Sequence, residues 1–408
     1  MIELVLLITT WLQARFGRED FLHALTFPGR VTGAVLLAVS FTTLVGAVAV
    51  LDHWVQHCFP YSGLVALIAT FTALLTNAMI LTETWKDGDS TVYKALFGAL
   101  TAGSAWAVFA VWRTSVTVPA PKRVAVAVIV PSLIAVANFG YQSLYQPYER
   151  ETRPIITLSV GKAVLSTDRK AFAVPVDITL QNLGERSFYV LGSEFHAMAQ
   201  RVALSPKDRL RQQWRADADQ WSRLPEVNPL SRREVHQPGD LLTAQPWMPY
   251  GQWIESSDTF ATQLVVELPI KTPYDQVTLY ATASLARKDR LVMQPPLNYL
   301  TKSWGGKGVP EWVKKQQAKD RDSDFIVYRA RVHENNAVDE HTRDARFVTV
   351  DWRFGPHGVT VASSIAREGE ESRVPSPSEQ REVASRYGLI DLVTGPYVRN
   401  LWDIKSQH

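Results

Sequence analysis

The sequence predicts a membrane α-helical bundle of four transmembrane helices, followed by a mainly β, sandwich-like soluble domain and a small α+β C-terminal segment. Two observations support this fold class. Four apolar stretches, at 31–51, 61–81, 95–112 and 124–145, contain no Asp, Glu, Lys, Arg or His, and each is about long enough to cross a hydrocarbon core of roughly 30 Å. After them, apolar and polar residues alternate with period two, which is typical of half-buried strands.

Composition limits the function classes. The 43 Lys and Arg residues nearly balance the 40 Asp and Glu residues, so the chain lacks the basic footprint that nucleic-acid binding needs. The part after the apolar stretches is rich in Trp, Tyr, Val and Leu, and we expect it to fold around its own core. Cys58 is the only cysteine, which excludes an intrachain disulfide and suits a reducing compartment.

The N-terminal segment 1–30 precedes the first predicted span. Its apolar run, residues 2–14, is short for a span and contains Glu3, and the charges Arg15 and Arg18 follow it rather than precede it. We therefore expect an interfacial helix, or a helix packed on the bundle, instead of a signal peptide. A fifth span is the alternative interpretation.

The predicted transmembrane domain covers residues 31–145. Its connecting loops are short, so sequential helices should be antiparallel neighbours. Lys and Arg in the flanks favour one side by seven to three, which predicts that the N-terminus and the C-terminal domain are both cytoplasmic. The residues on the favoured side are Arg15, Arg18, Arg30, Lys86, Lys94, Arg150 and Arg153, and those on the other side are Arg113, Lys122 and Arg123.

The most strongly polar side chains deep in the predicted bundle are those of Asn77, Thr101 and Asn138. At 1.5 Å per residue they lie about 6, 9 and 10 Å from the cytoplasmic end, so we expect a single polar layer. Because an unpaired amide is costly in hydrocarbon, these groups should hydrogen-bond across helices. The functional alternative is a polar step in a permeation path.

The soluble domain predicted over residues 146–300 consists of short strands. The clearest covers 172–180, where alternate residues are apolar, and Asn182 and Gly184 end it. Stretches 155–160, 188–191, 263–268 and 276–284 behave similarly, which predicts a β-sandwich architecture.

Residues 301–408 form a charged linker followed by the small α+β region. A short helix is expected after Pro310, and stretches 325–332, 346–354 and 358–365 predict a three-stranded meander. Ser376 and Pro377 are typical of a capped helix start, and Gly388 of its end. Gly395-Pro396 predicts a break in the segment that follows this helix. We expect a second helix in that segment, and the two helices together should cap the meander.

Three groups of residues suggest chemistry, and each also has a structural explanation. His53, His57, Asp52 and Cys58 have metal-ligand character, but the adjacent Phe59-Pro60 argues for irregular backbone there. The glycine-rich stretch 303–308 lacks the GxxxxGK[ST] pattern of a phosphate-binding loop, which leaves a flexible linker.

The third group occupies a predicted loop between two strands. Its two imidazoles and three carboxylates could bind a metal or transfer protons, and a solvated hairpin loop explains them equally well. These residues are His333, Glu334, Asp339, Glu340 and His341. A helix-turn-helix over 380–402 is disfavoured because the gap before Val398 is several residues too long for the turn and Gly395-Pro396 interrupts the second helix. No basic stripe accompanies it either.

We therefore expect no catalytic, cofactor-binding or metal site, and a non-enzymatic, multi-pass protein of the cell membrane. Its expected partners are the lipid bilayer and either another protein or a second copy, bound through the bundle or the β domain. The alternative function is a small-molecule transporter or channel formed by oligomerised four-helix units. The absence of charge in every predicted span counts against an ion or proton pathway.

Overall fold

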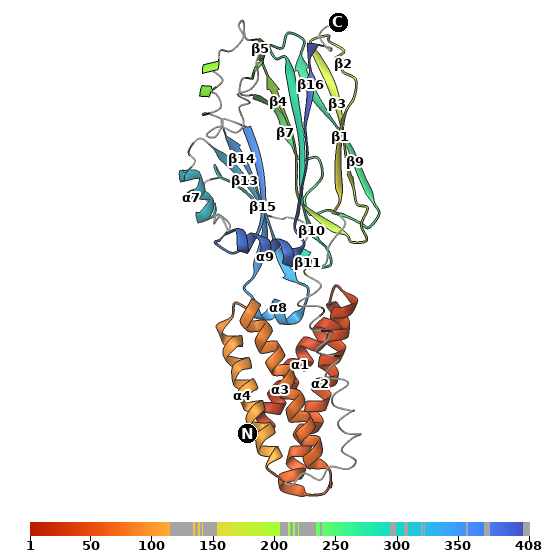
Figure 1. Ribbon diagram of the computed structural model, residues 1–408, viewed down its shortest axis with the longest axis vertical. Helices are drawn as coiled ribbons and strands as arrows, with labels where there is room; N and C mark the ends of the chain where they lie inside the picture. Colours follow the sequence, from red (N-terminus) through yellow and green to blue (C-terminus); the bar gives the residue numbers. More distant parts are fainter. Residues whose placement is uncertain are drawn as a thin grey trace.

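The computed structural model describes residues 1–114, 134, 138, 141, 153–204, 211–212, 215–216, 219, 234–236, 239–293, 299–305, 309–319, 321, 323–355, 358–370 and 376–402. The molecule is elongated, with a helical bundle at one end and a β domain at the other (Figure 1). The bundle contains α1 (Ile2–His23), α2 (Phe27–Leu51), α3 (Ser62–Asp87) and α4 (Thr91–Trp112), and α2 continues into a π-helical turn at Asp52–Gln56.

Three bundle helices in the described part of the chain are long and apolar enough to cross a membrane. They are Phe27–Gln56, Ser62–Asp87 and Thr91–Trp112, which contain the first three predicted spans. The predicted fourth span at 124–145 lies outside the described residues except for positions 134, 138 and 141. Large apolar side chains face outward along the bundle, as expected for lipid contact rather than for water. They include Leu4, Trp11, Phe41, Val48, Phe71 and Phe109.

Helix α1 packs along α2 at a close crossing between two glycines. A Cβ added at Gly33 would lie 2.3 Å from the Phe21 nitrogen, and one at Gly17 would lie 2.9 Å from the Gly33 oxygen. Ile2 shares a buried cluster with Val50, whereas Phe16 shares another with residues of the β domain. Helix α1 therefore runs toward the β domain, and Met1 lies toward the opposite end of the bundle (Figure 1).

Polar side chains bridge the bundle helices, as the sequence predicts. Asn77 on α3 donates to Thr9 Oγ1 on α1 at 3.0 Å and to Ser104 Oγ on α4 at 3.1 Å. Asn138 Nδ2 donates to Thr32 Oγ1 on α2 at 2.8 Å. Thr101 Oγ1 is buried and has no partner among the described residues, so the expected hydrogen bond of Thr101 is not found there.

The expected single polar layer is wrong in one respect, because the two asparagines bond at different depths. Ser104 lies about 20 Å along α4 from its domain-facing end, whereas Thr32 lies about 8 Å along α2. Each helix extends beyond its apolar stretch by a different length. Depths measured from the ends of the apolar stretches therefore differ from depths along the bundle.

We predict that Asn77→Leu lowers the stability of the detergent-solubilised protein by about 1 kcal/mol, because it removes two interhelical hydrogen bonds. Thermal unfolding measures this, with Thr82→Val as control, since the Thr82 hydroxyl bonds only the Ala78 oxygen of its own helix. The cost of Asn138→Leu should add to that of Asn77→Leu, because the two share no partner. Equal midpoints for Asn77→Leu and the control would contradict the assignment.

The first half of the β domain consists of two antiparallel sheets. One contains β1 (Ile155–Val160), β2 (Val164–Leu165), β3 (Ala171–Gln181) and β9 (Thr259–Pro269). The other contains β4 (Phe188–Gln200), β7 (Asp240–Gln245), β8 (Trp253–Ile254), β10 (Gln276–Arg287) and β16 (Ile390–Asn400). Both contribute to one buried apolar cluster, to which β3 supplies the predicted inward set Phe172, Val174, Val176, Ile178 and Leu180. A separate small pair is formed by β5 (Val202–Leu204) and β6 (Glu234–His236).

The predicted meander is confirmed as β13 (Asp324–Glu334), β14 (Arg346–Gly355) and β15 (Gly358–Arg367). β11 (Leu291–Met293) and β12 (Tyr299–Lys302) pair with β13 and complete a third antiparallel sheet. The expected helix after Pro310 is α7 (Glu311–Lys319).

Helix α9 (Pro377–Tyr387) has the predicted ends. The Ser376 hydroxyl and the Glu379 carboxylate form a capping box, and Gly388 adopts the left-handed conformation at the C-cap. The expected second helix is wrong, because the following residues form β16, which pairs with β10. Gly395-Pro396 lies where the register between β16 and β10 shifts, so it makes a bulge within the strand.

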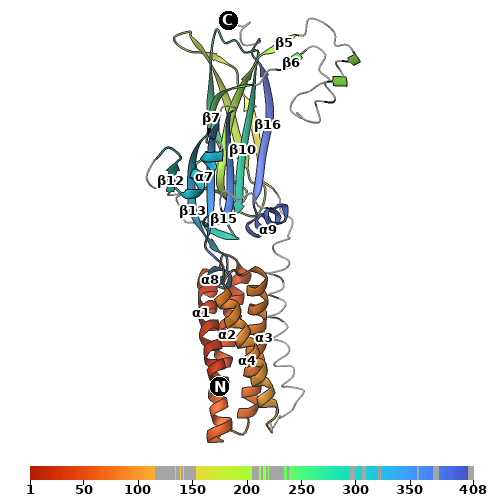
Figure 2. The same ribbon diagram turned by 90° about the vertical axis from the view of Figure 1, so that its left-hand side faces the viewer.

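A short helix, α8 (Ala337–Thr342), forms the tip of the β13–β14 hairpin. It projects from the β domain onto the end of the bundle (Figures 1 and 2). The residues that the sequence assigns to a solvated loop therefore lie where the two parts of the molecule meet.

Candidate functional site: the junction of the bundle and the β domain

Helix α8 docks on α1 through its backbone and its apolar face. The Asn336 side chain caps α8 by accepting from the Asp339 nitrogen at 2.7 Å. The Ala337 nitrogen donates to Asp20 Oδ1 at 2.6 Å, so a carboxylate of α1 satisfies another free N–H of the first turn. Ala337 and Val338 are buried in one cluster with Phe16 and Phe97 of the bundle.

The turn between α3 and α4 contacts the other end of α8. The nitrogens of Asp89 and Ser90 donate to the Thr342 oxygen at 3.0 and 2.9 Å. His341 Nε2 lies 2.9 Å from Glu19 Oε2, and its ring stacks on Phe16 with centroids 5.7 Å apart. Backbone, imidazole and carboxylate groups thus attach α8 to α1 and to the turn between α3 and α4.

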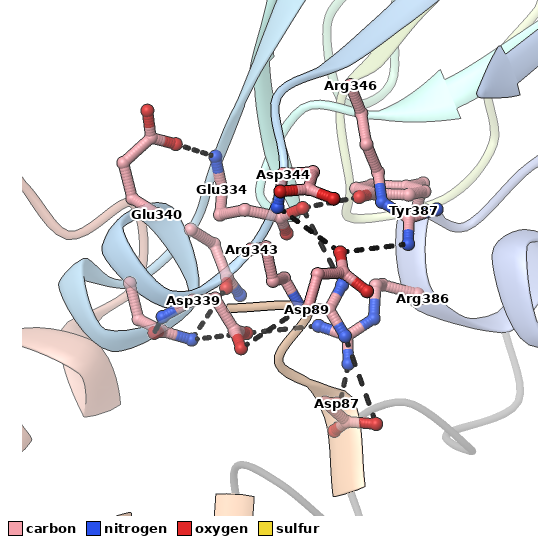
Figure 3. Close-up of polar contacts among 12 residues, drawn as sticks. Asp87, Asp89, Glu334, Asp339, Glu340, Arg343, Asp344, Arg346, Arg386 and Tyr387 are labelled. Carbon is pink, nitrogen blue, oxygen red and sulfur yellow. Dashed lines mark hydrogen bonds and ion pairs between the residues drawn. The ribbon is translucent and has the colours of Figure 1, made fainter. Parts of the chain in front are cut away.

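A buried ion-pair network connects these segments (Figure 3). The Arg343 side chain is only 2% exposed and lies 3.3 Å from Asp339, 3.7 Å from Glu334 and 3.8 Å from Asp87. Arg386, from α9, lies 2.9 Å from Asp87 and 3.0 Å from Asp339. Asp87 comes from the bundle and the other members from the β domain, so the network is complete only when the two parts are docked.

A second group of ion pairs lies at the start of α4. Asp89 contacts Arg367 and lies 4.0 Å from Arg346, and its carboxylate also accepts from the Asp344 nitrogen at 3.2 Å. The junction network comprises both groups together with Tyr387. Its members are Asp87, Asp89, Glu334, Asp339, Arg343, Arg346, Arg367, Arg386 and Tyr387.

Burial changes the acid–base properties of the network. Burial and, after it, Asp339 raise the pKa of Glu334, whose carboxylate accepts a hydrogen bond from the Tyr387 hydroxyl. Burial also raises the pKa of Tyr387. For Arg386, burial opposes the charge, but Asp339, Glu334 and Asp87 outweigh it and raise the pKa, so this guanidinium stays charged.

The structure separates the five hairpin residues that the sequence grouped together. Glu334 and Asp339 belong to the junction network, His341 pairs with Glu19, and His333 pairs with Glu340 at 2.9 Å. Within the described residues, no group of three or more His, Cys, Asp or Glu could hold a metal ion. The sequence missed Arg343, Arg386, Asp87 and Asp89, although Asp87-Gly88-Asp89 in so short a loop indicates charge at a helix junction.

The other two sequence groups lie away from the junction. At the opposite end of the bundle, both Asp52 oxygens accept backbone hydrogen bonds, from the Cys58 and Phe59 nitrogens at 3.0 Å each. His53 Nε2 lies 3.0 Å from Thr114 Oγ1. Asp52 therefore closes a turn. In the glycine-rich stretch, residues 306–308 lie outside the described residues.

A cavity of about 600 Å³ lies beside the junction network. One wall is formed by α2 and α3 of the bundle and is apolar at Val35, Leu36, Met79 and Ile80. The opposite wall belongs to α8, α9 and the turn after β10 and is charged. Its volume falls within the roughly 300–1,000 Å³ typical of small-molecule sites.

No family model matches the chain, and no curated protein matches it either.

We predict that Arg343→Met destabilises the protein by about 3 to 5 kcal/mol, because Arg386 alone must then balance the buried carboxylates of Glu334 and Asp339. The control is Arg331→Met on the same hairpin, whose side chain is 45% exposed and pairs with Glu340. The control should cost under about 1 kcal/mol. Thermal unfolding and proteolysis at the junction measure both, and equal effects would contradict a junction role.

A second prediction concerns pH. Burial raises the pKa of Asp20 to about 7, with Glu19 and Asp339 adding to the effect and the Ala337 N–H opposing it. Asp20 lies in the last turn of α1, outside the three candidate spans. Because the folded state holds this proton more tightly than the unfolded state, Asp20 costs stability as the pH rises from about 4 to about 7.

Asp20→Asn should therefore gain stability relative to the parent across that range, by about 4 kcal/mol at most, and the gain should level off above pH 7. The amide oxygen of Asn can still accept from Ala337. Thermal midpoints at pH 4.5, 6 and 8 measure the difference, and a difference that stays constant with pH would contradict the assignment.

Proposed function

We propose that this chain is an integral membrane protein that holds a β-rich binding domain in a fixed orientation at the membrane surface, where it binds a protein partner or a second copy. The junction network carries this proposal. The bundle carboxylates Asp87 and Asp89 pair with four guanidinium groups of the β domain, and these ion pairs exist only in the docked arrangement. Such an arrangement orients a domain, whereas a simple tether needs only a linker.

We also propose that the role is binding rather than catalysis. The carboxylates of Asp87, Glu334 and Asp339 each face a guanidinium within 3.8 Å, so their charge is used in pairing. The donor nitrogens of Gln13 and Asn77 bond neighbouring helices, which supports packing over a permeation path.

The finer architecture belongs to the same proposal. The hydrogen bond from Asn138 to Thr32 supports a fourth span at 124–145 packed on α2. The core shared by the β3 and β10 sheets supports the β-sandwich architecture.

For the orientation, we propose that the β domain is cytoplasmic. Arg15 and Arg18 lie in the half of α1 that approaches the β domain. Their positive charges therefore still add to the Lys and Arg excess on the side of the β domain, although Met1 lies toward the opposite side. The expectation that the N-terminus shares the cytoplasmic side does not fit the direction of α1.

This orientation predicts that Cys58, which is exposed at the far end of the bundle, reacts with an impermeant maleimide in intact cells. Cys58→Ser should abolish the labelling, because no other cysteine exists. A reporter that is active only outside the cytoplasm, fused after His408, should stay silent. Labelling that requires permeabilised cells, or an active fusion, would reverse the orientation.

The function itself is tested by measuring particle mass after mild detergent extraction of cells treated with a crosslinker. We expect a particle heavier than one 45.7 kDa chain, because of a second copy or a protein partner. Arg343→Met should reduce that fraction more than Arg331→Met does. A strictly monomeric particle, together with solute flux in proteoliposomes, would favour the transporter alternative instead.

A further inference from the structure

The junction cavity reaches from the β domain deep into the bundle. It is lined by Asp87 at the domain-facing end of α3 and by Thr76, eleven residues earlier. The apolar stretch of α3 ends at residue 81, so Thr76 lies about 8 Å inside it at 1.5 Å per residue. The cavity therefore reaches from the charged end of α3 into the apolar part of the bundle.

Polarity changes along the cavity in the way that an amphiphile requires. Its deep wall is mainly apolar, with Leu36 of α2 and Ile80 of α3 buried and Val35 and Met79 partly exposed, and Thr32 and Thr76 contribute hydroxyl groups to it. Charged side chains begin at Asp20 and Glu83 and continue onto α8 and α9. An apolar chain would thus lie inside the bundle and a polar group beside the β domain.

Two of the lining carboxylates, Asp20 and Glu83, have no cationic partner among the described residues. Asp20 is 3% exposed, and the one hydrogen bond that its carboxylate accepts there comes from the backbone N–H of Ala337. Glu83 has no hydrogen bond or ion pair among the described residues, and three of the four charges that act on it are the carboxylates Asp339, Asp87 and Asp20. The fourth, Arg386, already pairs with Asp87 and Asp339. This part of the cavity is chemically suited to a cation.

Two lining cations, by contrast, have no carboxylate partner within the described chain. Lys86 lies one turn beyond Glu83 on α3, and Arg381 lies on α9, where its Nε bonds only the Pro377 oxygen. Both side chains are exposed. The cavity therefore combines an apolar wall, a site for a positive group and two free positive groups.

We propose that the junction cavity binds a zwitterionic aminophospholipid from the leaflet adjoining the β domain. Its ammonium lies between Asp20 and Glu83, its phosphate faces Lys86 and Arg381, and an acyl chain packs against Leu36 and Ile80. The inference rests on the proposed function in one respect, that the bundle crosses a membrane. The bound lipid contacts both the bundle and the β domain.

Native mass spectrometry of the delipidated full-length protein in mild detergent tests this. The probes are phosphatidylethanolamine and phosphatidylglycerol with identical acyl chains, each added alone. We expect the ethanolamine lipid to bind about tenfold more tightly, because it alone supplies the ammonium. Equal affinities for the two lipids would overturn the proposal.

The double variant Asp20→Asn/Glu83→Gln should lose this preference and keep its affinity for phosphatidylglycerol. Glu368→Gln, an exposed carboxylate away from the cavity, is the matched control and should keep the preference. A preference that survives in the double variant would overturn the assignment. Thermal midpoints show whether the double variant is folded. If it is not, Lys86→Gln tests the proposal, because this variant should bind both lipids several-fold more weakly. Unchanged affinities for the two lipids would contradict the phosphate contact.

Soluble phosphoethanolamine separates a lipid from a free headgroup. It should compete only at a large excess, because it lacks the acyl chain, and competition at concentrations equal to the lipid would overturn the lipid assignment. The particle mass measured in the same samples separates the two proposals. If the parent protein forms the complex but binds the two lipids equally, this inference alone is contradicted. If the parent protein is monomeric but prefers the ethanolamine lipid, the proposed partner binding alone is contradicted.

Discussion

The burial of Arg343 is the constraint on which the arrangement of the two parts depends. Removing a guanidinium from water costs several kcal/mol, and three carboxylates from three different segments compensate for it. Asp339 belongs to the same short helix and Glu334 to the neighbouring strand, but Asp87 ends a bundle helix. Undocking the β domain would separate Asp87 from Arg343 and Arg386, so the ion pairs that join the two parts form only on docking.

The bundle supplies its side of the junction through the close crossing of α1 and α2. Since Gly17 and Gly33 carry no side chains, the two backbones approach closely, which an added Cβ at Gly33 would prevent at 2.3 Å from Phe21. This crossing holds the end of α1 beside α3, where Glu19 and Asp20 meet α8. Helix α1 is therefore part of the surface that receives the β domain.

On the β side, the position of Arg386 depends on the end of α9. Gly388 has a φ of 59°, and a Cβ there would lie 2.5 Å from Cδ of Arg287. Arg287 is itself fully buried and paired with Asp289. Only glycine fits this position, and it lets the chain leave α9 and return as β16 beside β10. The pairing of β16 with β10 thus fixes the position of α9, the helix that supplies Arg386 and Tyr387 to the junction network.

The sequence by itself determined the features that depend on near neighbours. Apolar length marked the spans, alternation marked β3, and the capping box at Ser376 marked the start of α9, because each is set by interactions within a few residues. Tertiary structure decided the rest. Gly395-Pro396 breaks an isolated strand but is accommodated as a bulge opposite β10, and only that pairing keeps the segment extended. The candidate site depends on contacts such as Asp20 with Ala337, which are 317 residues apart in the chain. Charged residues in a hairpin loop have the same local pattern whether water or a carboxylate from a distant helix neutralises them, so no local pattern could distinguish a solvated loop from the docked tip of α8.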